Sequence, residues 1–436
     1  MQATAILLAA GLGTRMKSAL PKTLHRIAGR SMLRHLIVSC EAVFDRIVVV
    51  LGPDMESVEM EAAPHTCVVQ RQRLGTAHAA LQAIDHFGTG QVAVLYADNP
   101  LIRPDTMRRL LERPDSGLGL LAFRPADPAR YGRVIETGGS VERIVEWADA
   151  TSSERAVGLC NAGVLCAAAP DMARWLRAVR NDNAKGEFYL TDVVAQARAE
   201  SARVTAIEAP AEELGGVNSR AELAAAEAVV QRWLRTAAMD AGVTMIDPSS
   251  VFLRTDTMFE PDVTIEPNVV FGDGVTVARG AVIRAFSHLD GCIVGPDCIV
   301  GPFARLRPGA ALERDVHVGN FVEVKASTLG AGVKANHLSY LGDASVGAGT
   351  NIGAGTITCN YDGYEKHRTT IGAGAFIGSN TALVAPVSVG DGATIGAGST
   401  IVDDVAADAL ALGRGRQVDR PGWSAAWRAL NERKRG

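Results

Sequence analysis

The feature that most constrains the fold is an aliphatic residue that recurs at every sixth position near the C-terminal end of the chain. The series runs unbroken through Ile371, Ile377, Leu383, Val389, Ile395 and Ile401. Glycine directly follows four of these residues, at positions 372, 378, 390 and 396. A period of six fits neither an amphipathic helix nor an alternating strand. It is typical of a hexapeptide parallel β-helix, in which each rung turns a corner and sends one aliphatic side chain inward.

The same step occurs earlier in the chain, at Val263, Val269 and Val275 and again at Val294 and Val300. The ladder is interrupted once, because "TCNYDGYEKHRTT" between Ile357 and Ile371 is too long for a single rung. This segment is expected to loop out of the β-helix, and loops on a rigid scaffold often carry binding groups. It contributes Asn360, Tyr361, Lys366 and His367.

The N-terminal half of the chain has a different pattern. Near-continuous apolar runs alternate with helix candidates, which is typical of an α/β domain around a mostly parallel sheet. The expected strands are Ala5–Ala10, Arg46–Leu51, Cys67–Gln70, Val92–Asp98 and Leu118–Phe123. The expected helices between them are Thr76–Phe87 and Thr106–Arg113. In such sheets ligands bind beyond the carboxyl ends of the strands.

A single long helix is expected between the two halves. The segment from Ala221 to about Met239 is rich in alanine and other good helix formers and contains no glycine or proline. The 45 glycines of the chain are concentrated after this segment. We therefore expect a domain over residues 1–220, a linker helix over 221–241, and a second domain over 242–436.

The loop after the first expected strand, "LLAAGLGTRMKSALPK" (Leu7 to Lys22), fits neither of the common nucleotide fingerprints. A P-loop would end in Gly-Lys-Ser/Thr, and a dinucleotide loop would need glycine where Met16 stands. The stretch nevertheless leaves backbone N–H groups bare at Gly11 and Gly13, with Arg15 and Lys22 within reach. This arrangement suits a polyphosphate.

Composition excludes several classes of function. A net charge of −4 provides no basic field for nucleic acid or an anionic membrane. There is no charge-free apolar run of about eighteen residues, as a membrane span requires, and the start of the chain has no signal-peptide pattern. The seven cysteines include no C-x-x-C pair and are expected to be reduced thiols. We therefore expect a cytoplasmic protein without nucleic-acid or membrane partners.

Motifs along the chain, from the N-terminus to about Arg416, resemble one family of bacterial enzymes, the bifunctional N-acetylglucosamine-1-phosphate uridyltransferases/glucosamine-1-phosphate acetyltransferases. The early motifs by themselves indicate only a sugar nucleotidyltransferase, whereas the later ones, above all "TITCNYDG", are far more specific. In chain order the motifs are LAAGLGTRM, LPKTLH, LGTAHA, YADNPL, YGRVIE, GVNSR, GPFARLRPGA, VGNFVEVK, HLSYLGDASVGAGTNIGAGTITCNYDG and APVSVGDGATIGAGS.

The resemblance implies two reactions and a fold. The C-terminal domain, a left-handed parallel β-helix, would acetylate glucosamine-1-phosphate from acetyl-CoA. The N-terminal, Rossmann-like domain would couple N-acetylglucosamine-1-phosphate to UTP with Mg²⁺, releasing pyrophosphate and the cell-wall precursor UDP-N-acetylglucosamine. Family members are homotrimers with acetyltransferase sites between neighbouring β-helices. Two alternatives remain open: a nucleotidyltransferase whose β-helix only oligomerises or regulates, and a non-enzymatic scaffold.

Uridylyl transfer is an in-line attack between two anions, so the site must supply cations and needs no covalent nucleophile. By the resemblance, Arg15 and Lys22 stabilise the phosphates, and Asp98 with Asn218 binds Mg²⁺. Asp98 has an alternative role as a turn residue, and Asn218 as a helix N-cap. The other residues implied for UTP and the UDP-sugar are Leu8, Ala9, Ala10, Gly11, Gln70, Gly75, Thr76, Tyr96, Ala97, Gly132, Glu146 and Asn161.

Acetyl transfer needs a base that titrates near neutrality, and histidine has that property. The resemblance implies His337 as the proton acceptor, with Glu323 as its orienting carboxylate. The residues implied for glucosamine-1-phosphate are Arg307, Lys325, Tyr340, Asn351 and Lys366. Those implied for acetyl-CoA are Ala354, Asn360, Tyr361, Ser379, Ala397 and Arg414, and Asn360 and Tyr361 are also implied to complete the sugar pocket.

The chain departs from the family pattern at a few positions. Leu12 replaces a lysine common in the glycine loop, Ala97 replaces a glycine before Asp98, and Ala326 replaces a second lysine present in some relatives. Ala162 stands where threonine is frequent. The tail "PGWSAAWRALNERKRG" also differs and is expected to form a short amphipathic helix.

Overall fold

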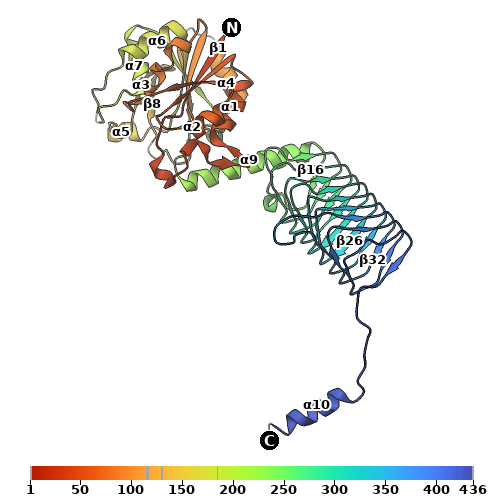
Figure 1. Ribbon diagram of the computed structural model, residues 1–436. Helices are drawn as coiled ribbons and strands as arrows, with labels where there is room; N and C mark the ends of the chain where they lie inside the picture. Colours follow the sequence, from red (N-terminus) through yellow and green to blue (C-terminus); the bar gives the residue numbers. More distant parts are fainter. Residues whose placement is uncertain (1, 114–116, 129–130, 184, 435–436) are drawn as a thin grey trace. The chain divides into compact units, whose positions relative to one another are not determined.

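The computed structural model describes residues 2–113, 117–128, 131–183 and 185–434 (Figure 1). It divides into two compact units, one over residues 1–234 and the other over residues 235–436. The first unit contains the α/β fold and the second contains the β-helix. The two units are described separately below.

A seven-strand path forms the main sheet of the first unit, in the order β11-β7-β10-β6-β1-β4-β5. Every neighbouring pair on this path is parallel except the two made by β10, which runs antiparallel to both β6 and β7. Two further strands, β8 and β9, extend it as a hairpin. The bounds are β1 Ala3–Leu8, β4 Arg46–Leu51, β5 Thr66–Val69, β6 Gln91–Tyr96, β7 Leu118–Phe123, β8 Arg133–Thr137, β9 Ser140–Val145, β10 Cys160–Ala168 and β11 Val204–Glu208.

Helices cover both faces of this sheet, which explains why its central strands β1, β4, β6 and β7 are almost wholly apolar and buried. Along β1, Ile6 belongs to one buried cluster, while Ala5 and Leu7 belong to the other. The first cluster includes residues of α3, α6 and α7, and the second includes residues of α1, α2 and α4. The helices are α1 Met32–Glu41, α2 Glu56–Ala62, α3 Thr76–Leu81, α4 Pro104–Leu111, α5 Ser152–Arg155, α6 Ala169–Ala178, α7 Val193–Ala199 and α8 Ala211–Leu214.

The expected helix Thr76–Phe87 is wrong in its second half. The α-helix α3 ends at Leu81, and a separate 3₁₀ turn follows at Ile84–His86. The side chain of Gln82 donates to the carbonyl oxygen of His78 at 3.0 Å and so takes the acceptor that its own backbone N–H would use in an α-helix. That N–H bonds instead to Ala79, three residues back. The helix therefore tightens and stops.

The long helix α9, Arg220–Asp240, is continuous, as the alanine-rich segment predicts. Its first turns pack on the first unit, where Ala226 and Val230 join a buried cluster with Ile27 and Met32. That cluster includes residues beside the short hairpin of β2, Arg26–Ile27, and β3, Arg30–Ser31. The packing fixes the position of the segment that directly precedes α9.

The second unit is a left-handed parallel β-helix with three sheets, here called the first, second and third faces (Figure 1). The first face comprises β12 Thr244–Met245, β14 Thr264–Ile265, β17 Val282–Ile283, β20 Ile299–Val300, β23 His317–Asn320, β26 Lys334–His337, β29 Asn351–Ile352, β32 Phe376–Ile377, β35 Thr394–Ile395 and β37 Leu410–Ala411. The second face comprises β13 Met258–Phe259, β16 Thr276–Val277, β19 Ile293–Val294, β22 Ala311–Leu312, β25 Thr328–Leu329, β28 Ala344–Val346, β31 Thr369–Ile371 and β34 Val387–Val389. The third face comprises β15 Val270–Phe271, β18 His288–Leu289, β21 Arg305–Leu306, β24 Glu323–Lys325, β27 Tyr340–Gly342, β30 Ile357–Cys359, β33 Ala382–Val384 and β36 Thr400–Ile401.

The six-residue ladder forms the core of this β-helix, as predicted. All six aliphatic side chains from Ile371 to Ile401 are buried. The interruption after Ile357 also behaves as expected, since Tyr361 and Lys366 pair as an antiparallel bridge outside the named strands. The tail contains the helix α10, Trp423–Glu432, with no buried residue. Within the described part of the chain, no helix is long and apolar enough to cross a membrane.

Candidate active sites

A cavity of about 330 Å³ lies at the carboxyl ends of β1 and β6 in the first unit. Leu8 is the last residue of β1 and Tyr96 is the last residue of β6, and both line it. Most residues expected to contact UTP gather here, namely Leu8, Ala9, Ala10, Gly11, Lys22, Gln70, Gly75, Thr76, Tyr96 and Asp98. Ala97 does not line the cavity, because its side chain is fully buried in the core.

Lys22 packs directly against the backbone of the glycine loop at Gly13. Gly13 has a φ of +61°, and a Cβ atom there would lie 2.5 Å from the Cβ of Lys22. Such a contact is far below van der Waals distance, so only glycine fits at this position. By contrast, a Cβ atom on Gly11 would have no atom within 4 Å. The backbone at Gly11 therefore lies open to the cavity.

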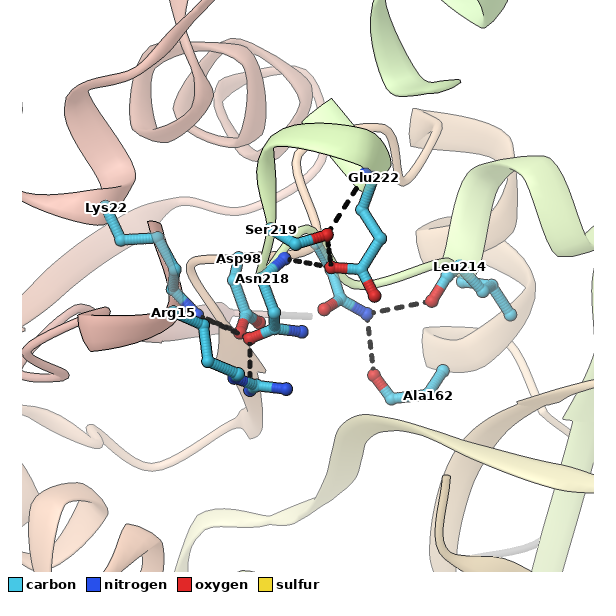
Figure 2. Close-up of polar contacts among 9 residues, drawn as sticks. Arg15, Lys22, Asp98, Ala162, Leu214, Asn218, Ser219 and Glu222 are labelled. Carbon is cyan, nitrogen blue, oxygen red and sulfur yellow. Dashed lines mark hydrogen bonds and ion pairs between the residues drawn. The ribbon is translucent and has the colours of Figure 1, made fainter. Parts of the chain in front are cut away.

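Four polar side chains from distant parts of the sequence converge at the edge of this cavity (Figure 2). The Asn218 Oδ1 atom accepts a hydrogen bond from Arg15 Nη2 at 2.8 Å and another from Lys22 Nζ at 2.9 Å. The same Lys22 ammonium also pairs with Asp98 Oδ2. Two cations, a carboxylate and an amide thus form one connected cluster.

Ser219, and not Asn218, caps the helix α9. The Ser219 Oγ atom accepts from the Glu222 backbone N–H at 3.2 Å, and Glu222 Oε2 accepts from the Asn218 N–H at 2.7 Å (Figure 2). Ser219 is therefore the N-cap of α9, and the Glu222 carboxylate binds the N–H of the residue before that cap. Because Ser219 satisfies the helix terminus, the Asn218 side chain remains directed at Lys22 and Arg15. The backbone of this segment is also tied to Asp98, whose carbonyl accepts from Val217 N–H at 2.8 Å.

The oxygens of Asp98 and Asn218 fit a divalent cation. Both face the same Lys22 ammonium, so the two oxygens point to a common region. Carboxylate and amide oxygens are hard ligands of the kind that Mg²⁺ uses, and this ion commonly keeps several waters. Among the described residues, no group of three or more His, Cys, Asp or Glu side chains is placed to hold a metal. Two protein oxygens are compatible with an ion that takes its other ligands from water and substrate.

A second cavity of about 210 Å³ adjoins the first and shares Tyr96 and Asp98 with it. It collects the remaining expected residues of the first unit, Arg15, Gly132, Glu146, Asn161 and Asn218. Burial raises the pKa of the Glu146 carboxyl. A hydrogen bond from Thr191 Oγ1 at 3.3 Å lowers that pKa and so offsets part of the effect. Gly163 allows the Tyr96 ring to form the wall, since a Cβ atom there would lie 2.2 Å from that ring.

Sequence reasoning missed several residues that line these cavities. Arg73 donates from Nε to the Ala10 carbonyl at 2.8 Å and so braces the glycine loop. Its place two residues before Gly75 was an available signal, and it adds a second cation, beside Lys22, to the wall of the first cavity. Asn99 donates to the carbonyls of Ala162 and Leu214, which anchors the residue that follows Asp98. The other residues missed are Thr23, Ala79 and Glu187 in the first cavity and Tyr131, Ala162, Gly163 and Gly216 in the second.

In the β-helix the expected acetyl-transfer residues form a column along one corner. Strand register pairs Asn320 with His337, and the pairings Ala335 with Ile352, Ile352 with Ile377 and Ile377 with Ile395 continue upward. On each coil the residue two positions after the paired aliphatic residue stands at the corner. On successive coils these corner residues are Asn320, His337, Ala354, Ser379 and Ala397. Arg414 Nη1 donates to the Ala397 carbonyl at 2.7 Å at the upper end.

His337 is exposed at the end of β26 and lines a cavity of about 380 Å³. Its Nδ1 atom lies 3.2 Å from Asn320 Oδ1. The expected orienting carboxylate, Glu323, is engaged elsewhere, because its Oε1 atom accepts from Arg307 Nη1 at 2.7 Å. Among the described residues, the side chain that contacts the His337 ring is the amide of Asn320.

A cationic cluster lies on the third face beside this corner. Arg305 and Arg307 both approach Glu323, with Arg305 Nη1 at 3.8 Å from Glu323 Oε2. The pKa of Lys366 is lowered, mainly by the neighbouring Lys325 ammonium. Two cations held this close favour an anion between or beside them, such as a phosphate.

The looped segment is anchored to the third face by Asn360. Its Nδ2 atom donates to Asp343 and lies 3.5 Å from the Tyr340 hydroxyl. Gly342 permits the Tyr340 ring to lie flat here, since a Cβ atom would sit 2.3 Å from that hydroxyl. Tyr361 is exposed beyond the anchor. Asn351, half-buried on β29, completes the expected set on the adjoining face.

Comparison with known proteins matches both units. The family model of the MobA-like NTP transferase domain covers residues 5–189, and that of the bacterial transferase hexapeptide repeat covers residues 368–403. A protein of Gluconacetobacter diazotrophicus named "Bifunctional protein GlmU" is 64% identical over 99% of this chain and 95% of its own length. Proteins of the same name from Acidiphilium cryptum and Granulibacter bethesdensis are 63% and 62% identical over 98% and 96% of this chain.

The chain belongs to the bifunctional GlmU family. The GlmU relatives extend across the nucleotidyltransferase fold and the β-helix together, so the resemblance first seen in separate motifs holds along the chain. The departures from the GlmU pattern lie at the margins of both sites. Leu12 is exposed, Ala97 is buried in the core, and Ala326 occupies a left-handed corner with a φ of +44°. None of the three is part of the polar clusters described above.

Proposed function

We propose that this chain makes UDP-N-acetylglucosamine in two steps. The unit containing the β-helix transfers an acetyl group from acetyl-CoA to the amine of glucosamine-1-phosphate. The α/β unit then transfers the uridylyl group of UTP to the N-acetylglucosamine-1-phosphate so formed and releases pyrophosphate. The single observation that carries the proposal is that relatives of the GlmU family match both units as one chain.

In the uridylyl site, the first cavity would take UTP and the second the sugar phosphate. The open backbone at Gly11 and the buried amide of Gln70 would hold the uridine end. Lys22 and Arg15 would neutralise the phosphates as the attacking oxygen approaches the α-phosphorus in line. Electrostatic stabilisation of this kind acts without any covalent intermediate. Glu146 and Asn161 would accept and donate hydrogen bonds to the sugar and its acetamide.

Mg²⁺ is the metal we propose for this site, with Asp98 and Asn218 as the residues that hold it. When bound there, the ion would neutralise negative charge on the phosphate oxygens. Lys22 contacts the same two oxygens in the present arrangement, so it would move toward the phosphates when the metal binds. Arg15 would keep the Asn218 amide oriented through its 2.8 Å hydrogen bond.

In the acetyl-transfer site, His337 would remove a proton from the substrate amine as that amine attacks the thioester carbonyl. The phosphate of glucosamine-1-phosphate would be held by Arg307 and Lys325 of the third face and by Lys366 of the looped segment. Tyr340 lies on the third face and Asn351 on the first. Acetyl-CoA would lie along the column above His337, formed by Ala354, Ser379 and Ala397. Asn360 and Tyr361 would border both substrates.

We propose further that the chain acts as a homotrimer. The β-helix carries an exposed stack of rings, Phe286, Phe303 and Phe321, that are 53%, 45% and 56% exposed. Their centroids are 4.9 and 5.3 Å apart on consecutive coils. An exposed apolar row of this kind is typical of a protein interface. Packing between β-helices would also enclose the exposed His337, which is open on one side within a single chain.

The proposal is tested by supplying each reaction separately to the purified chain. With glucosamine-1-phosphate and acetyl-CoA, free CoA should be released. With N-acetylglucosamine-1-phosphate, UTP and Mg²⁺, pyrophosphate should be released. Pyrophosphate release without any acetyl transfer would favour the alternative, a single-activity nucleotidyltransferase with a structural β-helix. If neither CoA nor pyrophosphate were released, the enzymatic assignment would be rejected.

A further inference from the structure

We propose that Asn320 is the positioning residue of the general base in acetyl transfer. In this assignment its Oδ1 atom accepts the Nδ1–H of His337, so that Nε2 of the ring is unprotonated and available to the substrate amine. The inference rests on the proposed function of His337 and adds the residue through which its ring is oriented. It gives Asn320 the role that the sequence resemblance gives to Glu323.

The backbone brings the two side chains together. Asn320 and His337 are directly paired in the parallel ladder of β23 and β26. The next residue in each rung, Phe321 and Leu338, turns the corner with a left-handed φ of 56° and 47°. Leu338 N–H donates to the Asn320 carbonyl at 3.0 Å, which locks the two corners in register. Because the backbone of both rungs is fixed, the Asn320 amide is held beside the His337 ring.

The carbonyl of His337 is held from the other side. Ser339 Oγ, which is buried, donates to it at 2.8 Å. With the backbone fixed on both sides, the remaining freedom of His337 is rotation of its side chain. The 3.2 Å contact from Nδ1 to Asn320 Oδ1 restricts that rotation and lies within the range of an N–H···O hydrogen bond.

The contact also selects the proton position on the ring. In neutral histidine one nitrogen carries the proton and the other is the acceptor, and the hydrogen bond made by one decides which is which. An amide oxygen at Nδ1 places the proton there. The lone pair is then on Nε2, which is the form a general base requires on its substrate side.

Glu323 is not available for the same task. It accepts from Arg307 at 2.7 Å, and the Arg305 guanidinium lies 3.8 Å from its other oxygen. It lies on the third face, in register with Arg305 and Tyr340, whereas His337 lies on the first. Its contacts therefore orient the guanidinium of Arg307 beside the phosphate-binding lysine cluster.

Other charged or titratable groups lie near the ring among the described residues, and Asp315 lies 3.5 Å from His317. Arg284 and His317 line the same cavity, and Lys334 lies on the same strand as His337. Arg305, Arg307 and Glu323 belong to the adjoining face. Arginine keeps its charge throughout the working pH range, and His317, on the facing strand β23, is the second imidazole of this cavity. Its replacement is the matched control.

The kinetic test compares Asn320→Ala, Asn320→Asp and the control His317→Ala in acetyl transfer. We expect Asn320→Ala to lower kcat about 10- to 100-fold with KM values for both substrates changed less than about threefold. Asn320→Asp keeps an acceptor and adds a negative charge that favours the imidazolium. We therefore expect it to retain kcat within about threefold at its own optimum, with the acid limb of the pH profile moved to higher pH.

Near-normal kcat in Asn320→Ala, or an Asn320→Asp variant as slow as Asn320→Ala with an unmoved acid limb, would overturn the proposal. Should Asn320→Ala fail to fold, Asn320→Asp and Asn320→Ser serve in its place. The ring tautomer gives a readout independent of activity. In ¹⁵N NMR, with His337 assigned by its loss in His337→Gln, we expect an Nδ1-protonated ring in the unmodified protein. An Nε2-protonated ring there would refute the assignment even if acetyl transfer itself were absent.

Discussion

The Nζ atom of Lys22 and the Oδ1 atom of Asn218 lie 2.9 Å apart, although 196 residues separate them in the sequence. The contact closes the nucleotide site, because Lys22 belongs to the segment after the glycine loop and Asn218 directly precedes the capped helix α9. Packing of α9 on the first unit holds Asn218 in place. The amide is therefore positioned by the fold of the whole unit and not by its neighbours in sequence.

Replacing Asp98 by asparagine should remove uridylyl transfer selectively. The isosteric amide keeps the shape but loses the charge that pairs with Lys22 and would hold Mg²⁺. We expect pyrophosphate release to fall about 100- to 1000-fold, with the Mg²⁺ dependence weakened and acetyl transfer within about twofold of normal. The control is Asp54→Asn, at a left-handed turn position that asparagine tolerates. Full uridylyl activity of Asp98→Asn at low Mg²⁺ would remove Asp98 from the metal site.

Replacing His337 by alanine should have the opposite effect. Loss of the general base should abolish the release of CoA from acetyl-CoA in the presence of glucosamine-1-phosphate. Pyrophosphate release from N-acetylglucosamine-1-phosphate and UTP should stay near normal. The reason is that the two reactions are assigned to separate units. A parallel collapse of uridylyl transfer would contradict this separation.

Gly13→Ala should damage the nucleotide site more than the same change at Gly138. Both glycines have a φ of +61°, so both variants carry the left-handed penalty of about 1–2 kcal/mol. Only at Gly13 does the new methyl group also meet Lys22, at 2.5 Å, whereas nothing lies within 4 Å at Gly138. We expect Gly13→Ala to raise the KM for UTP and lower kcat, and Gly138→Ala to change only the free energy of unfolding. Equal kinetic effects in the two variants would mean that the Lys22 contact is unimportant.

Acid should destabilise the first unit through its buried histidines. Burial, reinforced by the neighbouring Arg220, lowers the pKa of His25 below its usual 6.5. The unfolded chain therefore takes up a proton that the folded chain resists, and the free energy of unfolding falls as the pH drops below about 6.5. His25→Asn removes this proton while offering an oxygen to Arg220, so urea unfolding between pH 5 and 7.5 should show a shallower slope than normal. The difference can reach about 1.4 kcal/mol per pH unit, and identical slopes would show that His25 does not contribute.

Placing a charge in the stack of rings should separate the subunits. In Phe303→Asp the carboxylate would stand between Phe286 and Phe321, where we expect another chain to pack. Sedimentation should then report a monomer, with acetyl transfer lost and uridylyl transfer retained. Phe252→Asp, at another exposed ring outside the stack, is the control. A trimer that survives in Phe303→Asp would place the interface elsewhere.

The sequence predicted those parts of the fold that depend on local period. The ladder from Ile371 to Ile401 is buried as expected, because each rung buries its aliphatic residue whatever its neighbours do. The end of α3 was not predictable in the same way, since it depends on one side chain, that of Gln82, competing for the His78 carbonyl. The amino-acid composition of a segment does not show whether such a side-chain contact forms.

The partner of His337 lay outside sequence prediction for a geometric reason. Three rungs of six would place Leu338, not His337, above Asn320. The coil between Asn320 and His337 is one residue shorter, with a separation of 17, and this brings the amide to the ring. Likewise, Lys22, Asp98 and Asn218 could be proposed one by one from the resemblance, but their convergence required the fold. Arg73 and Asn99 were missed because their contacts are to backbone carbonyls from distant segments.

The most direct test of the whole account is a single reaction followed with two detectors. The purified chain is mixed with glucosamine-1-phosphate, acetyl-CoA, UTP and Mg²⁺, and free CoA and pyrophosphate are measured over time. We expect CoA to appear first and pyrophosphate to follow after a lag, with no pyrophosphate when acetyl-CoA is omitted. Pyrophosphate release that needs no acetyl-CoA, or CoA release that never leads to pyrophosphate, would contradict the two-step synthesis.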